Sequence, residues 1–156
     1  MYHRNFFHLV WTTRERRPAI DLPRAQFLAH YLPIVARQER GAIRALGIVS
    51  THVHILIQAD PVLMLPRVMQ RFKGGSSTLV SQQRIGNPQN PLRWAKGYSS
   101  KTVGEQSVQR VIEYVESQSR RHPAEAIAGW VTRTATPDMA ASAAIAETRR
   151  SLMSHP

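Results

Sequence analysis

One short stretch, residues 51–57 (THVHILI), constrains the fold of this 156-residue chain more than any other. Its β-branched and aliphatic residues predict a buried strand. Side chains alternate across a strand, so His52 and His54 face one side while Val53, Ile55 and Ile57 face the other. The sheet that contains this strand therefore has an apolar face to be covered and a second face that carries two imidazoles.

The paired histidines have two interpretations. Neutral imidazole is a common metal ligand, so His52 and His54 can form half of a metal site. Two histidines at this spacing can also be merely solvated or hydrogen-bonded, and the strand alone does not decide between the two. A third ligand and a nucleophile elsewhere in the chain would favour the metal site.

The first half of the chain supplies two more strands and a helix. Residues 6–13 and 42–49 predict strands, and a tight connection joins the second of them to the histidine strand as an antiparallel hairpin. Between them, residues 22–40 predict a helix that Pro33 kinks or splits and that Gly41 ends.

In the second half of the chain, predicted helices and strands again follow one another. Residues 63–72 predict a helix that stops at residues 73–77 (KGGSS), and residues 92–103 predict a fourth strand bent at Gly97. A third helix follows Ser107, and the alanine-rich residues from Ala124 onward indicate further helix. The order strand, helix, strand, strand, helix, strand predicts an α+β fold, a ferredoxin-like sandwich with an antiparallel sheet, followed by additional helices.

The third helix carries the residues that the histidine pair lacks. Tyr114 and Gln118 are four positions apart, so they share one helical face. If this helix lies across the open face of the sheet, its tyrosine and glutamine meet His52 and His54. A Tyr-x-x-x-Gln pair is common in helices, and only that structural context gives it weight.

The charge of the chain points to a polyanionic partner. The sequence has 18 arginines and 3 lysines against 10 acidic residues, a formal net charge of +11. The arginine side chain is a planar fork that matches phosphate and stacks on bases, so this balance favours nucleic acid. An arginine-rich composition can also reflect a GC-rich genome.

Other sequence features bear on location. No apolar run reaches the roughly 18 residues of a membrane span, and no signal-peptide apolar region follows Met1. The absence of cysteine excludes disulfides and thiolate metal sites and fits a reducing cytoplasm. We therefore expect a cytoplasmic protein without a membrane partner.

Several motifs occur together in a recognisable order. They are WTTR at residues 11–14, His52-Val53-His54, VMQRFKGGSS at 68–77, WAKGY at 94–98 and YVESQ at 114–118. In this order they resemble the HUH nucleases, and among these the single-tyrosine transposases of small bacterial insertion sequences and the REP-associated tyrosine transposases. The resemblance implies a transposase domain over residues 1–122, with residues 123–156 as a C-terminal helical extension or tail of the same domain.

The resemblance also implies a chemistry. Tyr114 would be the nucleophile that cleaves and rejoins single-stranded DNA at hairpin-flanked sites through a 5′-phosphotyrosine. His52, His54 and Gln118 would hold a divalent cation. The softness of imidazole alone favours Zn²⁺ or Mn²⁺, whereas the resemblance implies Mg²⁺ or Mn²⁺.

The resemblance leaves the assembly and the biological role open. It allows a homodimer or a monomer, Tyr114 acting within its own chain or across a dimer, and either a mobile element or a domesticated protein. In either case we expect a bacterial protein associated with the nucleoid. The competing hypothesis is a non-catalytic ferredoxin-like nucleic-acid-binding protein. On either hypothesis, the candidates for contact with the DNA backbone are Arg14, Arg16, Arg17, Arg71, Lys73, Ser76, Ser77, Lys96, Arg120 and Arg121.

Overall fold

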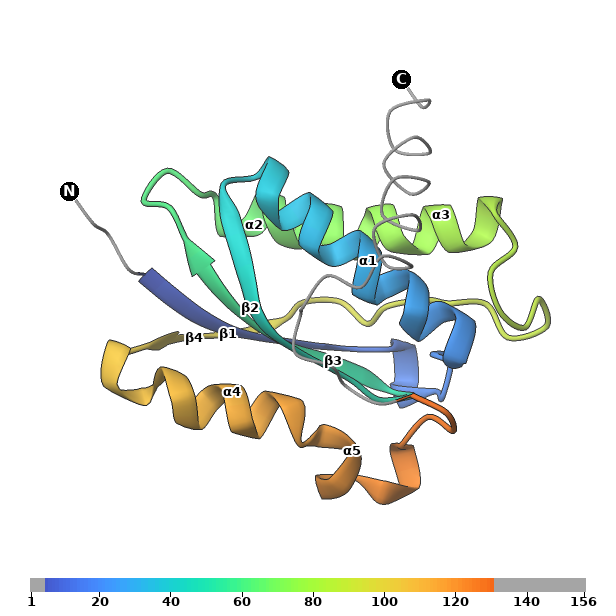
Figure 1. The fold of residues 1–156 in the computed structure, drawn as a ribbon. Coiled ribbons are helices and arrows are strands. Elements are labelled where there is room, and N and C mark those ends of the chain that lie inside the picture. The colour runs from blue at the N-terminus through green and yellow to red at the C-terminus, as the bar shows by residue number, and fades with distance from the viewer. Residues whose placement is uncertain (1–4, 131–156) are drawn as a thin grey trace, which may run out of the picture.

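The computed structural model describes residues 5–130, and a four-stranded antiparallel sheet lies at its centre (Figure 1). The strands are β1 (Asn5–Thr12), β2 (Gly41–Ile48), β3 (His52–Ala59) and β4 (Ser99–Val103), in the spatial order β2-β3-β1-β4. All three strand pairs are antiparallel. This order confirms the predicted ferredoxin-like α+β fold.

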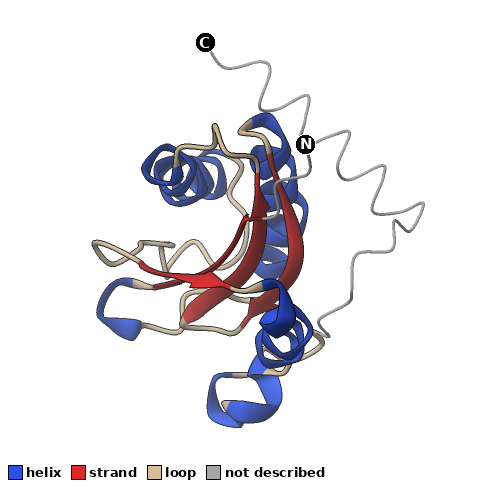
Figure 2. Cartoon of the chain, turned by 90° about the vertical axis from the view of Figure 1, so that its left-hand side faces the viewer, coloured by secondary structure: helices blue, strands red, loops and turns tan. Residues whose placement is uncertain are grey.

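Helices cover both faces of the sheet, as Figures 1 and 2 show. On one face lie α1 (Leu22–Gln38), α2 (Leu65–Gln70) and α3 (Ser76–Gln82); on the other lie α4 (Val108–Glu116) and α5 (Gln118–Arg121). Among the residues described, no helix is long and apolar enough to cross a membrane.

Strand alternation divides the apolar side chains between two cores. Leu9 and Trp11 of β1 join Val53, Ile55 and Ile57 of β3 in the large core beneath α1, α2 and α3. Strand residues that face the other way, Phe6, Ala45 and Leu56, pack with Val115 of α4 in a smaller cluster. Strand β3 is therefore buried on both faces and brings its histidines to the α4 side, whereas β1 is only partly covered there.

The predicted end of the second helix at residues 73–77 is wrong. A π-helical turn, η2 (Arg71–Gly75), joins α2 directly to α3, and Gly75 has helical torsion angles. Close packing explains this glycine, because a Cβ atom there would lie 1.8 Å from the hydroxyl of Tyr31. The stretch is a packed helical junction, so the helical run continues through the glycines.

Three other boundaries differ from the predictions. Arg40, with a φ of 67°, makes the left-handed turn after α1, and Gly41 instead begins β2. Pro33 lies inside a helix that remains unsplit. The fourth strand covers only residues 99–103 of the predicted range 92–103. Before it, Trp94 makes one isolated bridge to Thr13.

The predicted C-terminal extension is described only in part. Residues 123–125 form a short 3₁₀ turn rather than a longer helix, and Ile127 is buried in the large core. The remainder of the alanine-rich segment, residues 131–156, lies outside the described residues.

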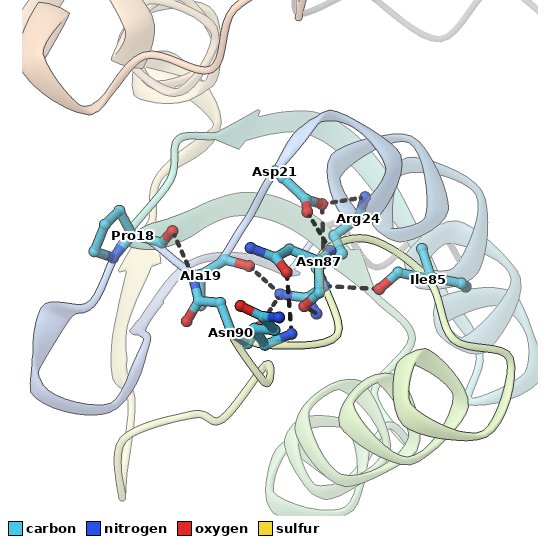
Figure 3. Close-up of polar contacts among 8 residues, drawn as sticks. Pro18, Ala19, Asp21, Arg24, Ile85, Asn87 and Asn90 are labelled. Atoms are coloured by element: carbon cyan, nitrogen blue, oxygen red, sulfur yellow. Dashed lines mark hydrogen bonds and ion pairs between the residues drawn. The ribbon is translucent and has the colours of Figure 1, made fainter.

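A buried arginine at the start of α1 fixes the long loop before β4 (Figure 3). Arg24 is 3% exposed, and Asp21 caps the helix by accepting a hydrogen bond from the Arg24 backbone amide. The guanidinium donates to four backbone carbonyls, those of Ala19, Ile85, Asn87 and Asn90, at 2.5–2.9 Å. One side chain thus satisfies acceptors from two segments that are far apart in sequence.

We expect Arg24→Met to lower the free energy of unfolding by about 3 kcal/mol, because four carbonyls lose their donor in a buried site. Chemical denaturation monitored by circular dichroism measures this difference. Arg37→Met is the matched control, since Arg37 is exposed on the same helix. Equal stabilities of the two variants would contradict a clamping role for Arg24.

Candidate functional site

The histidine pair lies at the start of β3, on the face that α4 covers. His52 and His54 are both buried, and their rings meet edge to face with centroids 5.1 Å apart. On one side, β1 pairs Thr12 with His52; on the other, β2 pairs Gly47 with His54. Backbone pairing on both sides therefore fixes the position of the two imidazoles.

Tyr114 and Gln118 of the same chain meet this pair. The Tyr114 ring lies 5.7 Å from the His54 ring, centroid to centroid and nearly perpendicular to it. The Gln118 Oε1 atom lies 3.4 Å from the His52 Nε2 atom. Gln118 is almost fully buried, whereas Tyr114 is 37% exposed, so the phenol can be reached from solvent.

The sequence predicts that Tyr114 and Gln118 lie on one continuous helix, and this prediction is wrong. Helix α4 ends at Glu116, and Ser117 separates it from α5. The Gln118 side chain bridges the break, because its Nε2 donates to the Tyr114 carbonyl at 3.0 Å. This bond directs the other amide atom, Oε1, towards His52.

Gly47 allows α4 to approach so closely. A Cβ atom at this position would lie 2.0 Å from the carbonyl oxygen of Val115 and 3.1 Å from the Gln118 Cγ atom. The backbone of the α4–α5 junction thus rests on a strand residue that has no side chain. The position of Tyr114 and Gln118 relative to the histidines depends on this contact.

Burial keeps both imidazoles neutral. Desolvation, together with the smaller effects of the neighbouring His52, His8 and His122, lowers the pKa of His54 to about 3. Burial also lowers the pKa of His52, against the opposing effect of Gln118, whose Oε1 atom can accept a hydrogen bond from the protonated ring. Neutral imidazole is the form that binds a metal ion.

The donor atoms present are compatible with a small divalent cation. Two ligands of an octahedral Mg²⁺ ion lie about 3 Å apart, close to the observed separation of His52 Nε2 and Gln118 Oε1. Within residues 5–130 there is no group of three or more His, Cys, Asp or Glu side chains that could hold a metal. A cation here would therefore rely on the Gln118 amide and take its remaining ligands from water and phosphate oxygens.

A third histidine belongs to this site and was missed in the sequence. His8 Nε2 lies 2.9 Å from His54 Nδ1, and the two rings stack with centroids 5.2 Å apart. The His8 ring also packs edge-on against Tyr114 at 5.8 Å. Strand parity could have found it, because Leu9 and Trp11 face the large core and place His8 on the opposite face.

Glu125 was also missed. Its carboxylate accepts a hydrogen bond from the Thr51 hydroxyl at 2.7 Å, and that hydroxyl oxygen lies 2.9 Å from His52 Nδ1. The Thr51 hydrogen bond is the main reason why the pKa of Glu125 is lowered. No sequence signal links the two positions, because the contact spans 74 residues.

Six of the predicted DNA-contact residues lie near the end of β1 or beside Tyr114. The turn after β1 exposes Arg14, Arg16 and Arg17, and the backbone of residues 93–95 runs alongside it, which places Lys96 next to it. On α5, the Arg121 guanidinium stacks on the Tyr114 ring at 4.7 Å and hydrogen-bonds Ser117, with Arg120 exposed beside it. A role in DNA binding remains a prediction for these residues.

The other four belong to the α2–α3 run, on the opposite face of the sheet, and have partners within the protein. Arg71 binds Glu39 and Gln38, and Lys73 donates to the carbonyls of Ala95 and Gly97. Ser76 is buried and accepts from Trp94 Nε1, while Ser77 donates to the carbonyl of Gly74. The structure therefore does not place these four beside the histidine pair.

Comparison with known proteins agrees with this architecture. A family model described as IS200-like transposases matches residues 2–118. The ISDra2 transposase TnpA of Deinococcus radiodurans is 25% identical over 118 residues, which cover 72% of this chain and 82% of that protein.

Two solved structures share the fold. A crystal structure of a protein from Deinococcus radiodurans R1 superposes with a TM-score of 0.58 at 25% identity, over 76% of this chain and 93% of that one. A REP-associated tyrosine transposase bound to a REP hairpin gives a TM-score of 0.61 at 16% identity, over 84% and 73% of the two chains.

The family model covers the whole sheet, the histidine pair and the helix that carries Tyr114. The chain belongs to the IS200-like transposase family.

Proposed function

We propose that this transposase cleaves and rejoins single-stranded DNA with Tyr114 as its nucleophile. The observation that carries the proposal is that one chain brings together Tyr114, two buried neutral histidines and the Gln118 amide. All four side chains come from the same protomer, so a monomer would have a complete site.

The reaction is a transesterification. The Tyr114 hydroxyl oxygen attacks the scissile phosphorus, the bond from phosphorus to the 3′ oxygen breaks, and the phenol proton ends on the released 3′ hydroxyl. The downstream strand remains joined to Tyr114 through its 5′ phosphate. Because one phosphoester replaces another, the reverse attack by a 3′ hydroxyl rejoins strands without an external energy source.

The protein side chains orient the reactants. His52, His54 and Gln118 would hold the divalent cation, Mg²⁺ or Mn²⁺, which when bound neutralises phosphate charge and stabilises the 3′ oxygen as it leaves. Arg121, stacked on the Tyr114 ring, adds positive charge where the phosphate must approach. The ring contacts with His8 and His54 limit how far the phenol can swing.

We propose that the substrate carries a DNA hairpin next to the cleavage site. A structural neighbour is described with a bound REP hairpin, and the net charge of this chain is +11. Exposed arginines follow the strand end that pairs with His52, which suits a phosphate backbone leading into the site.

The test is formation of a covalent adduct on a library of single-stranded oligonucleotides with hairpins. A label on the 3′ end of the DNA should stay with the protein on a denaturing gel, whereas a label on the 5′ end should leave with the 3′-hydroxyl fragment. Peptide mass spectrometry should locate the modification on Tyr114. Binding of the library without any adduct would favour the non-catalytic DNA-binding alternative.

Removal of divalent metal should abolish adduct formation and leave most DNA binding intact. EDTA-treated protein is expected to give no adduct, and Mn²⁺ or Mg²⁺ added in excess over the chelator should restore it. Fluorescence anisotropy of the labelled hairpin measures binding in parallel. Adduct formation at an unchanged rate in EDTA would rule out the proposed role of His52, His54 and Gln118.

A further inference from the structure

A chain of hydrogen bonds reaches His52 from outside the segment that matches the family model. The matched segment ends at residue 118, and Glu125 lies seven positions beyond it. The Glu125 carbonyl accepts from the Ser50 amide at 2.8 Å, and Ile127 is buried in the large core. These contacts hold the Glu125 side chain against the turn between β2 and β3.

The position of each proton in the hydrogen bonds between Glu125, Thr51 and His52 follows from the chemistry of the three groups. An ionised carboxylate only accepts hydrogen bonds, so the single hydroxyl proton of Thr51 points to Glu125. The Thr51 oxygen must then accept from His52 Nδ1, 2.9 Å away. A neutral imidazole has one N–H, so the Nε2 atom of His52 is left with a free lone pair.

That lone pair faces another acceptor. The Gln118 Nε2 atom donates to the Tyr114 carbonyl, which turns the Gln118 Oε1 atom towards His52 Nε2 at 3.4 Å. Two acceptors at this distance, with no proton between them, attract a cation or the protons of a water molecule. The arrangement prepares a ligand pair before any cation binds.

We propose that Glu125 is a positioning residue that acts through Thr51 to fix the tautomer of His52 and so keep its Nε2 atom available for the cation. This inference rests on the proposed function, which gives the cation its role. The other charged groups around the carboxylate are Arg16 and His122, each 3.6 Å away. They can hold the carboxylate in place, whereas only Thr51 connects it to the ring by short hydrogen bonds.

The sharpest variant is Glu125→Gln, which keeps the shape of the side chain and supplies an amide donor that can reverse the direction of these hydrogen bonds. A glutamine amide can donate to the Thr51 oxygen, and the Thr51 proton then points to His52 Nδ1. The ring must carry its proton on Nε2, where it points at Gln118. We expect this variant to bind Mn²⁺ about 10–100-fold more weakly than the wild type.

Two measurements test the inference on metal-free protein, without DNA. Nitrogen-15 NMR of labelled histidine should show His52 protonated on Nδ1 in the wild type and on Nε2 in Glu125→Gln. Titration with Mn²⁺, followed by electron paramagnetic resonance, should show the loss of affinity. Thr51→Val should weaken Mn²⁺ binding in the same way, and Thr51→Ser should restore wild-type behaviour because it keeps the hydroxyl.

Glu39→Gln is the control for the loss of one negative charge, since Glu39 follows α1 at the far end of the sheet from His52. It should bind Mn²⁺ within about twofold of the wild type. A wild-type His52 protonated on Nε2, or unchanged affinity in both Glu125→Gln and Thr51→Val, would overturn the inference. If both results appear as expected but no DNA adduct forms, the proposed function fails and the role of Glu125 in orienting His52 stands.

Discussion

Tyr114→Phe is expected to reduce the covalent protein–DNA adduct by at least about 10³-fold, to the limit of detection, because the variant lacks the attacking oxygen. The fold should not change. Phenylalanine keeps the ring that contacts His8, His54 and Arg121. We therefore expect the free energy of unfolding to stay within about 0.5 kcal/mol of the wild type, and hairpin binding to stay within about twofold.

Tyr98→Phe provides the matched control. Tyr98 is 38% exposed, against 37% for Tyr114, and the substitution removes the same atom. This variant should form the adduct at the wild-type rate. A Tyr114→Phe protein that still forms an adduct, with the DNA attached to another residue, would disprove the nucleophile assignment.

Gly47→Ala should reduce the rate of adduct formation by about 100-fold without changing any side chain that contacts DNA or metal. The new methyl group would lie 2.0 Å from the Val115 carbonyl, and backbone on both sides leaves no flexible group to give way. The α4–α5 junction must move, and Val115 lies between Tyr114 and Gln118 in the chain. A misplacement of about 1 Å in a reacting group is enough for a loss of this size.

Single-turnover kinetics with saturating hairpin DNA measures this rate, and circular dichroism shows whether the variant is folded. We expect a moderate loss of stability of about 1–3 kcal/mol, as for other overpacked sites. Gly104→Ala is the control, since Gly104 has ordinary extended torsion angles and nothing lies within 4 Å of an added Cβ atom. A wild-type rate for Gly47→Ala would show that the position of α4 is not critical.

The fold could be predicted because the local patterns are strong and agree with one another. The alternation of His52, Val53, His54 and Ile55 fixes which face of β3 is apolar, and the tight connection after Ile48 allows only a hairpin. The failures have a common cause, which is tertiary packing. Gly75 looks like a helix end in the sequence, yet it is a glycine because the Tyr31 hydroxyl occupies the space of its side chain.

In the site, too, local sequence patterns could be interpreted correctly, whereas contacts between distant residues could not. Spacing placed Tyr114 and Gln118 on one helical face, and the family resemblance implied their shared role. The structure brings them to the histidine pair despite a break in the helix. Glu125 could not be predicted, because its link to His52 passes through a turn residue 74 positions away. Long-range hydrogen bonds of this kind leave no periodic trace in a sequence.

The double burial of β3 has a consequence for how this protein can vary. A slip of one residue in the strand would exchange His52 and His54 with Val53 and Ile55, placing imidazoles in the large core and aliphatic groups under α4. Each imidazole moved into the apolar core would lose its hydrogen-bond partners, at a cost of about 1–3 kcal/mol, so such a chain would not fold stably. Insertions and deletions within β3 should therefore be eliminated as folding defects before they could yield a folded protein with a misdirected site.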